Sequence, residues 1–403
     1  MMKRRVFSFD TGTRAFIGAE EAERIFRPHA EKNIPYSKIC FSYRTFSLDA
    51  ALVTMSFLLS LKDHLKEVDL SGTLLGNPEE IALEVMRIFS SALEGCALRY
   101  LNLSDNYLGE KGVRAIGPLL KSQNRLEELY LRNDGISDEA AQALCELIPS
   151  TKMLKVLHFH NNRTGRNGAI AISELIKRSP ALEDFRCTST RAGPEGGLPL
   201  IQALKTCSNL KKLDIKDNRF GVEAAVALSN TLSSHLCLVE IYLSYMNFGN
   251  VGSIAIANAL AKYAPLLEVL DLAKNEITAE AAPALAACIA LKQSLTKLIL
   301  CNNELKDEGV VSICKALEGH NQLKEVNMNA NKLTRAGARV LAQTVIHKPK
   351  FRLLRIGENF ISNEGVDELF EMFKKHPNLL DTLYRNDPEG GESNVEAGNE
   401  DEL

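Results

Sequence analysis

Residues 98–112 read LRYLNLSDNYLGEKG, and this stretch decides the fold. Its apolar and polar residues follow the spacing L-x-x-L-x-L-x-x-N-x-L, with a small residue four places further on, at Leu98, Leu101, Leu103, Asn106, Leu108 and Gly112. This spacing is the signature of a leucine-rich repeat, in which a short strand turns into a helix. One copy cannot bury its apolar faces alone, so neighbouring copies must stack.

The same spacing continues in register along most of the chain. The asparagine position, here called the slot, recurs every 28 residues with one interval of 29, at residues 106, 134, 162, 190, 218, 246, 275, 303, 331 and 359. The sequence therefore predicts an α/β leucine-rich-repeat solenoid, a ribonuclease-inhibitor-like horseshoe of about 11–12 strand-helix repeats with a parallel sheet on its concave face. We expect each slot asparagine to bond main-chain groups that would otherwise be buried without partners.

Three parts of the chain are expected. Residues 1–35 form an N-terminal capping segment in which VFSFD adds a strand, and residues 36–384 form the leucine-rich-repeat domain. Residues 385–403 are acidic and carry no apolar pattern, so we expect a disordered tail. The interval from Thr73 to Asn106 is 33 residues, so the repeat between them contains an insertion.

Composition excludes several classes of function. The 48 basic residues are balanced by 51 acidic ones, so no overall positive field points to nucleic acid. Nine cysteines without a C-x-x-C pair indicate a reducing compartment, and we expect a cytoplasmic protein. No secretory signal and no run of 18 apolar residues occurs, so membrane insertion is not expected.

The sequence gives no case for a self-contained enzyme. It contains no glycine-rich phosphate loop and no Ser-His-Asp or Cys-His arrangement. His158 and His160 share one face of a strand, but no pattern completes a metal ligand set. Outward strand residues such as Tyr130, His158 and Arg186 are of types that protein interfaces favour, although an ordinary solvated face remains the alternative.

One turn departs from the others. In LYLRNDGIS, residues 129–137, the slot is Asp134 and the asparagine, Asn133, falls one place early. One place before the slot, a side chain should point toward solvent and reach a partner. Asn161 and Asn302 also occupy this position, so an asparagine there is not diagnostic by itself.

Over about residues 6–390 the chain resembles the leucine-rich-repeat domain of the Ran GTPase-activating proteins, in particular the plant type. The resemblance is carried by the order and number of the segments RAFIGAEEAE (14–23), EVDLSG (67–72), ALRYLNLSDNYLGEKGVRA (97–115), LEELYLRNDGISDEAA (126–141), LHFHNN (157–162), LEDFRCTSTR (182–191), NELKDEG (303–309), RAGARVLAQTV (335–345) and NDPEG (386–390).

The resemblance implies that the protein docks on the GTP-bound form of a Ran-like small GTPase and accelerates hydrolysis on that partner. It requires no cofactor of its own, since GTP and Mg²⁺ belong to the GTPase. Many activators insert an arginine finger, but this family is thought to use an asparagine that contacts the partner's glutamine, and that asparagine maps onto Asn133. The expected partner-binding residues are Asp105, Tyr130, Arg132, Asn77, Asn161, His158, His160 and Arg186.

The stretch DLSGTLLGNPEE, residues 69–80, departs from the family pattern. Family members typically have Asp and Phe at the places of Gly72 and Thr73, and an arginine that matters for activation at the place of Asn77. Asn77 followed by Pro78 also reads as the N-cap and first residue of a helix. The resemblance therefore allows an activator that is weakened by the loss of this arginine. The alternative is a diverged, activation-deficient module that acts as a binding scaffold or regulator.

Two further points stay open in the sequence. A third alternative, a generic leucine-rich-repeat inhibitor or receptor segment, fits the fold but not the family-specific segments. Plant members carry an additional N-terminal domain that directs them to the nuclear envelope, so the resemblance makes the nuclear envelope a second expected location. This chain differs from those members in starting just before the repeats. Oligomeric state is not indicated.

Overall fold

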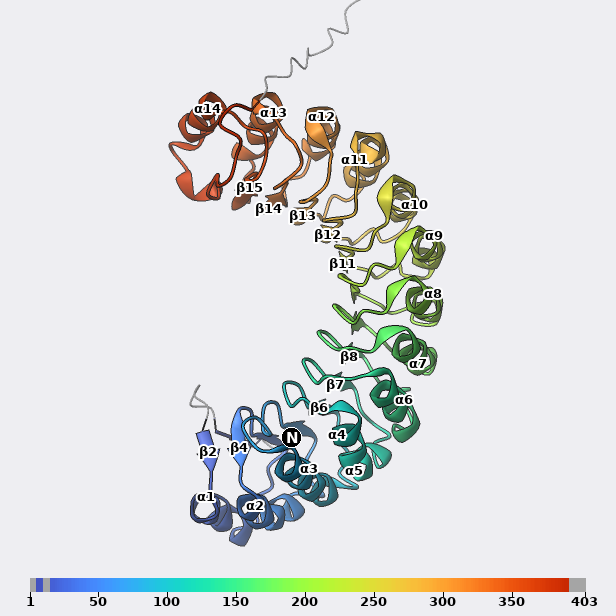
Figure 1. Ribbon diagram of the computed structural model, residues 1–403, viewed down its shortest axis with the longest axis vertical. Helices are drawn as coiled ribbons and strands as arrows, with labels where there is room; N and C mark the ends of the chain where they lie inside the picture. The colour runs from blue at the N-terminus through green and yellow to red at the C-terminus, as the bar shows by residue number, and fades with distance from the viewer. Residues whose placement is uncertain (1–4, 10–14, 391–403) are drawn as a thin grey trace, which may run out of the picture. The chain divides into compact units, whose positions relative to one another are not determined.

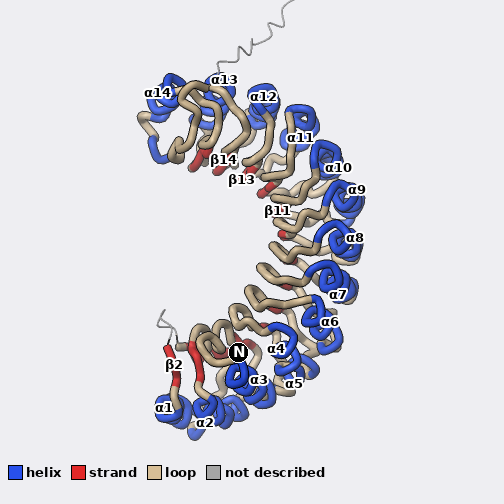
Figure 2. Tube along the Cα trace, viewed as in Figure 1, coloured by secondary structure: helices blue, strands red, loops and turns tan. Residues whose placement is uncertain are grey.

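The computed structural model describes residues 5–9 and 15–390 and divides into two compact units, Met1–Leu210 and Lys211–Leu403. Each unit alternates three-residue parallel strands with helices (Figure 1). In both units the helices lie on one side of the strands (Figure 2). The predicted leucine-rich-repeat architecture with an open parallel sheet is confirmed.

In the described part of the first unit, parallel strands pair in the order β1 (Val6–Ser8), β3 (Lys38–Cys40), β5 (Glu67–Asp69), β6 (Tyr100–Asn102), β7 (Glu128–Tyr130), β8 (Val156–His158) and β9 (Asp184–Arg186). A separate pair is formed by β2 (Ala15–Ile17) and β4 (Arg44–Phe46). The helices are α1 (Ala19–Glu31), α2 (Leu48–Ser60), α3 (Glu79–Leu93), α4 (Gly109–Ala115), α5 (Gly117–Lys121), α6 (Asp138–Leu147), α7 (Gly165–Lys177) and α8 (Gly193–Leu204).

The second unit continues the alternation of strand and helix. Its strands are β10 (Lys212–Asp214), β11 (Glu240–Tyr242), β12 (Val269–Asp271), β13 (Lys297–Ile299), β14 (Glu325–Asn327) and β15 (Leu353–Arg355), which pair in that order. Its helices are α9 (Gly221–Thr231), α10 (Gly249–Lys262), α11 (Ala282–Ala290), α12 (Lys306–Leu317), α13 (Arg335–Ile346) and α14 (Asn363–Phe373), with 3₁₀ turns η1 (Leu232–Ser234), η2 (Ala279–Ala281) and η3 (Pro377–Leu379).

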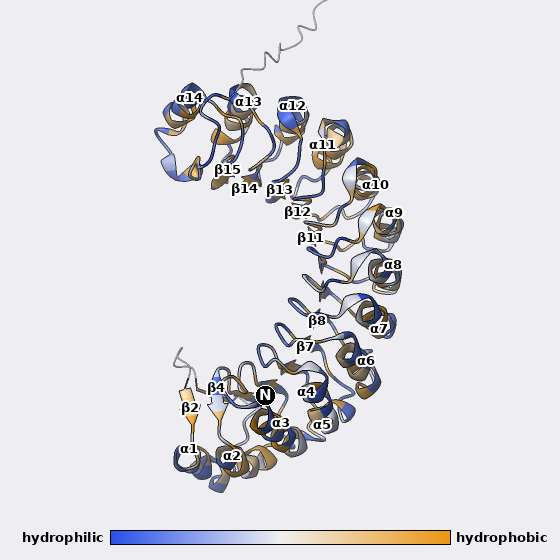
Figure 3. Cartoon of the chain, viewed as in Figure 1, coloured by the Kyte–Doolittle hydropathy of each residue, from blue (hydrophilic) through white to orange (hydrophobic). Residues whose placement is uncertain are grey.

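The core lies between strands and helices. The middle residues of neighbouring strands stand in register, so Leu101, Leu129 and Leu157 form a continuous buried row. The helices carry both hydrophobic and hydrophilic residues, as Figure 3 shows, because only one face of each packs on the sheet. Neighbouring helices approach closely: a Cβ on Gly168 of α7 would lie 3.3 Å from the Cβ of Ala141 in α6.

The first end of the array is sealed by aromatic packing. Strand β1 pairs with β3, as expected for a capping strand. Phe7 packs against Phe26 with ring centroids 5.6 Å apart, and Phe26 packs against Phe41 at 5.5 Å. Large rings of this kind bury the apolar face that a first repeat would otherwise expose.

The slot asparagines perform the expected structural task. Asn303 is buried; its Oδ1 accepts hydrogen bonds from the main-chain N–H groups of Asn275 and Ile277 at 3.0 and 3.1 Å. Its Nδ2 donates to the carbonyls of Leu272 and Leu300 at 3.1 and 2.9 Å. One amide therefore satisfies buried main-chain groups in two neighbouring repeats.

The inserted loop after β5 corrects one expectation. Helix α3 begins at Glu79 with Pro78 in the N-cap position, so Asn77 is not the cap and Pro78 is not the first helical residue. The Asn77 Nδ2 instead donates to the carbonyl of Phe46 at 2.9 Å. Its side chain is thus used to fasten the longer loop to the preceding repeat, which a local capping rule does not foresee.

Hydrogen bonds continue past residue 384, the expected end of the repeats. Asn386 Oδ1 accepts from the N–H of Asn359 at 2.9 Å, which gives the last repeat a slot residue as well. The remainder of the expected acidic tail, residues 391–403, lies outside the described residues. All nine cysteines are free thiols. Within the described ranges, no helix is both long and apolar enough to cross a bilayer.

Alanine substitutions at Asn302 and Asn303 compare how much the slot residue and the residue before it contribute to stability. Asn303→Ala leaves several buried main-chain groups without partners, and each costs about 1–3 kcal/mol, so we expect a loss of about 3 kcal/mol or more in the free energy of unfolding. Asn302→Ala, at an exposed residue with φ +57°, should cost only the roughly 1–2 kcal/mol of an alanine in a left-handed turn. Equal losses in denaturant titrations would contradict this assignment.

Candidate functional site

In the turns that follow the sheet strands β3 and β5 to β9, the residue one place before the slot adopts the left-handed conformation. These residues, here called the rim row, stand one place before the slot with φ between +53° and +64°: Tyr43, Gly72, Asp105, Asn133, Asn161 and Ser189. Glycine, asparagine and aspartate accept this conformation most readily. The sequence thus favours polar residues at the positions where side chains leave the sheet.

The main chain fixes the spacing of the rim row. The N–H of Asp105 donates to the carbonyl of Arg132 at 2.7 Å, and the N–H of Asn133 donates to the carbonyl of His160 at 3.1 Å. Each rim residue is therefore tied to the next repeat at the distance between neighbouring strands, about 4.8 Å. Residues 28 apart in the chain become hydrogen-bonding neighbours.

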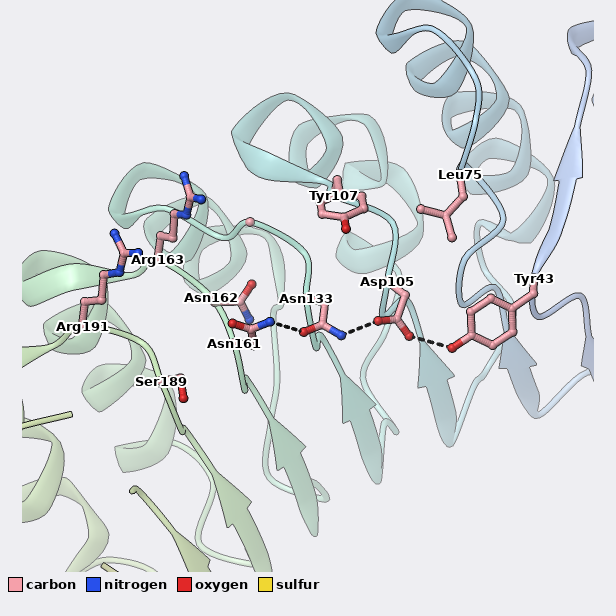
Figure 4. Close-up of a pocket in the computed structure, with 11 residues that line it drawn as sticks. Tyr43, Leu75, Asp105, Tyr107, Asn133, Asn161, Asn162, Arg163, Ser189 and Arg191 are labelled. Carbon is pink, nitrogen blue, oxygen red and sulfur yellow. Dashed lines mark hydrogen bonds between the residues drawn. The ribbon is translucent and has the colours of Figure 1, made fainter. Parts of the chain in front are cut away.

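A continuous chain of side-chain hydrogen bonds runs along the rim row (Figure 4). The Tyr43 hydroxyl donates to Asp105 Oδ2 at 3.0 Å, and Asn133 Nδ2 donates to Asp105 Oδ1 at 2.5 Å. Asn161 Nδ2 then donates to Asn133 Oδ1 at 2.6 Å. The hydrogen bond to Asp105 is also the main reason why the pKa of Tyr43 is raised, with burial adding to it.

This chain fixes the orientation of the Asn133 amide. A carboxylate can only accept hydrogen bonds, so the Asn133 nitrogen must face Asp105 and its oxygen must face Asn161. One N–H and one lone pair of the amide then remain for another molecule. The amide of Asn133 is half-buried and is held by side chains rather than by its own turn, as expected for a residue one place before the slot.

The rim row borders a hollow of about 640 Å³. Arg163 and Arg191 stand at one end of it, and Tyr43 and Leu75 at the other, with Asn133 between them (Figure 4). Gly135 lines the hollow beside Asn133 with φ +61°, and open space surrounds the position where its Cβ would be. A partner side chain can therefore approach the free edge of the Asn133 amide.

Sequence reasoning missed several residues of this hollow, namely Tyr43, Leu75, Tyr107, Gly135, Arg163, Ser189 and Arg191. The repeat period itself could have found most of them. Tyr43 and Ser189 share the rim-row position with Asn133, and Tyr107, Gly135, Arg163 and Arg191 recur at 28-residue steps one place after the slot. Comparing the residues at the same repeat position, including the turn positions and not only the strand positions, would have identified them.

The predicted partner-binding residues fall into three groups. Asp105 and Asn161 lie in the hollow with Asn133, and Arg132 lies beside them, its Nη2 3.9 Å from Asp105 Oδ2. Asn77 lies outside it and lines a second hollow of about 610 Å³, which shares Leu75 and Tyr107 with the first.

The other four predicted residues lie outside the hollow: Tyr130, His158 and Arg186 end strands β7, β8 and β9, and His160 follows β8 by two residues. The rings of Tyr130 and His158 meet edge to face at 4.8 Å, and His158 Nε2 lies 3.2 Å from Asp184 Oδ1. Burial acts to raise the pKa of Asp184, but contacts with His158 and Arg186 outweigh it and hold the pKa at about 2. Among residues 5–9 and 15–390, no group of three or more His, Cys, Asp or Glu could hold a metal.

The slot next to Asn133 is unusual because Asp134 occupies it. Its Oδ1 accepts from the N–H of Asn106 at 2.9 Å, the same task as an asparagine oxygen. Its Oδ2 is buried and has no hydrogen-bond partner, in the place from which asparagines donate to carbonyls. Burial is the main reason why the pKa of Asp134 is raised well above its ordinary value. Protonation of this carboxyl would place a donor where the asparagine Nδ2 stands in other slots.

Comparison with known proteins first gives the class. The leucine-rich-repeat family matches residues 96–117, 206–229, 263–286 and 292–314. A chain of the yeast Rad7–Elc1 complex has a TM-score of 0.55 at 16% identity, over 90% of this chain and 82% of that one. An internalin from Listeria monocytogenes has a TM-score of 0.52 at 14% identity, over 86% and 80%. The protein is thus a leucine-rich-repeat protein.

Closer relatives give the particular family. RAN GTPase-activating protein 2 of Arabidopsis thaliana is 65% identical over 387 residues, which cover 96% of this chain and 71% of that protein. RAN GTPase-activating protein 1 of the same plant is 58% identical over 125 residues, 31% of this chain and 23% of that protein. The chain belongs to the RAN GTPase-activating protein family, as its segments predicted.

Asp134 provides a test of the slot chemistry through pH. The folded chain keeps the Asp134 proton at pH values where the unfolded chain, with an ordinary pKa of about 3.9, has released it. The contribution of Asp134 to stability must then fall as pH rises above about 4, by up to about 1.4 kcal/mol per pH unit until the raised pKa is reached. Asp134→Asn should remove this dependence, so the variant gains stability over the natural chain, and more at pH 8 than at pH 5.

The measurement is the free energy of unfolding of both chains across that pH range. Asn303→Asp is the reciprocal control, because it should introduce the same loss with rising pH at a slot that now holds an asparagine. A constant difference between Asp134→Asn and the natural chain at all pH values would contradict a protonated Asp134.

Proposed function

We propose that this protein accelerates GTP hydrolysis by the GTP-bound form of the small GTPase Ran, the activity named for its Arabidopsis relatives. The observation that carries the proposal for the site is the Asn133 amide, held between Asp105 and Asn161 with one N–H and one lone pair left over beside an open hollow. The hollow receives the part of the GTPase that carries its water-orienting glutamine.

The chemistry that Asn133 supplies is orientation. In small GTPases a glutamine aligns the attacking water, and hydrolysis is slow when the glutamine side chain is not held in one conformation. An amide that both donates and accepts can hold another amide by two complementary hydrogen bonds. Because Asn133 is already fixed before the partner arrives, little conformational freedom is lost when the contact forms. Asn133 thus acts on the partner's active site rather than on GTP itself.

Arg163 and Arg191 have a different task in this proposal. They are exposed at the end of the hollow, opposite Asp105, so the hollow has an acidic and a basic end. Charges at such a border steer association and fix the orientation of the complex. We assign the two arginines to docking against acidic groups of the partner and the rate effect to Asn133.

The remaining features of the proposal concern partners and location. GTP and Mg²⁺ are carried by the GTPase, so the activator holds no cofactor, and the balance of 48 basic and 51 acidic residues argues against nucleic acid as a partner. Membrane insertion is not part of the proposed activity. The nine free thiols support a cytoplasmic location, and the cytoplasmic face of the nuclear envelope is the second location that the family suggests.

Asn133→Ala is the direct test. Phosphate release from GTP-loaded Ran at saturating activator should fall by roughly 10²–10³-fold, the loss seen when a positioned polar group is removed from an active site. Asn302→Ala is the matched control, because Asn302 has the same repeat position and nearly the same φ, +57° against +53°. It should leave the rate unchanged.

The same assay separates the alternatives. Loss of rate in Asn302→Ala to the same extent would show a general effect of the substitution. No stimulation by the natural chain, together with stimulation by Asn77→Arg, would support an activation-deficient scaffold instead.

Substitution of the two arginines tests docking against arginine-finger chemistry. Arg163→Ala and Arg191→Ala should weaken binding of GTP-loaded Ran and raise the concentration of activator needed for half-maximal stimulation, more so at low salt. The rate at saturation should stay within about threefold of the natural chain. A fall of roughly 10³–10⁵-fold at saturation, the value of an arginine finger, would assign catalysis to that arginine and overturn the role given to Asn133.

A further inference from the structure

The first residue of the rim row, Tyr43, borders the hollow without a role of its own in the proposed function, and its side chain ends the hydrogen-bond chain that holds Asn133 (Figure 4). Its hydroxyl donates to Asp105 Oδ2 at 3.0 Å, while Asp105 Oδ1 accepts from Asn133. Both carboxylate oxygens are therefore engaged by side chains of the rim row.

The reach from Tyr43 to Asp105 depends on the residue between them. Tyr43 and Asp105 are two repeats apart, so their main chains are separated by about two strand spacings, or roughly 10 Å. Gly72 stands between them at φ +63°, and the Tyr43 ring lies over it. A Cβ on Gly72 would be 2.6 Å from Tyr43 Cδ1 and 3.0 Å from Cε1. The ring can cross to Asp105 only because residue 72 has no side chain.

Without the hydroxyl, the carboxylate of Asp105 is free to turn. Its Oδ2 would then face only Arg132, whose Nη2 is 3.9 Å away, and water. Rotation of the carboxylate lengthens or breaks the 2.5 Å contact between Oδ1 and Asn133 Nδ2. Since this contact is what dictates which end of the Asn133 amide carries the nitrogen, its loss allows the amide to turn over.

We propose that Tyr43 is a positioning residue that acts through Asp105 to hold the Asn133 amide in a single orientation. Gly72 is required because its missing side chain leaves the space that the Tyr43 ring occupies. The assignment rests on the proposed function for its effect on GTP hydrolysis, but not for its effect on the Asn133 amide. Tyr43 itself makes no contact with the reacting groups.

The first experiment uses the free protein. Tyr43→Phe removes the hydroxyl and keeps the ring, and the side-chain NH₂ resonances of Asn133 are followed by nuclear magnetic resonance, assigned by their absence in Asn133→Ala. We expect Tyr43→Phe to shift these resonances and to broaden them as the amide exchanges between orientations. Gly72→Ala should have the same effect although it leaves every group of the hydrogen-bond chain in place.

Tyr245→Phe is the matched control. Tyr245 occupies the corresponding repeat position in the second unit with φ +56° against +55° for Tyr43. Its hydroxyl bonds to Arg219, and Lys274 Nζ lies 4.0 Å from the centroid of its ring, so it takes no part in the chain that holds Asn133. This variant should leave the Asn133 resonances unchanged.

The second experiment measures stimulation of GTP hydrolysis on Ran by the same variants. Tyr43→Phe should lower the rate at saturating activator roughly three- to tenfold, the value of about one hydrogen bond, with the affinity for GTP-loaded Ran unchanged within twofold. If Tyr43 had only a structural role, Tyr43→Phe would lower the melting temperature but would not lower the saturating rate while leaving the affinity unchanged. Tyr245→Phe should change neither quantity.

The outcomes separate the two proposals. Unchanged Asn133 resonances in Tyr43→Phe overturn the positioning role, as does a fall in affinity that accounts for the whole loss of rate, because Tyr43 would then contact the partner directly. Shifted resonances in a chain whose natural form gives no stimulation support the positioning of the amide and overturn the proposed function instead.

Discussion

The left-handed turn that follows strands β3 and β5 to β15 is the constraint on which the other features depend. It sends two adjacent residues in opposite directions, the slot residue into the protein and the rim residue out of it. The inward side chain must form hydrogen bonds with buried main-chain groups, because water does not reach those groups. The outward side chain is released from that task. A leucine-rich repeat thus presents one adaptable residue per repeat on a rigid support.

Repetition converts this local rule into a site. Main-chain hydrogen bonds hold successive rim residues one strand spacing apart, so their side chains can bond one another across 28 residues of sequence. Tyr43, Asp105, Asn133 and Asn161 form a single chain in which the carboxylate sets the direction of every bond. The Asn133 amide is therefore oriented by the fold itself, which is the arrangement that its proposed role in activation requires.

Much of the fold followed from the sequence because the period is strict. The slot spacing located the strands, and the leucines at fixed places gave the buried rows. The inserted loop was less predictable. Asn77 and Pro78 match the pattern of a helix start, but the Asn77 side-chain amide donates instead to the carbonyl of Phe46, 31 residues away. Hydrogen bonds between residues far apart in sequence override local preferences of this kind, and a local sequence pattern does not predict them.

The candidate site was accessible to the same reasoning only in part. The place of Asn133 followed from comparison of one turn with its neighbours, whereas Tyr43 lies two repeats from the residue it bonds, across Gly72. The residue types at positions 43, 72 and 105 are each unremarkable alone. Their relation depends on the stacking distance and on an absent Cβ, which emerge only when the repeats are assembled.

The structure of this protein bound to Ran with a non-hydrolysable GTP analogue tests the central claim most directly. We predict that the Asn133 amide lies within hydrogen-bonding distance, about 3 Å, of the side-chain amide of the GTPase's water-orienting glutamine while keeping its contact with Asp105. An Asn133 side chain that faces solvent or only its own neighbours in that complex, with an arginine reaching the phosphates in its place, would contradict the account.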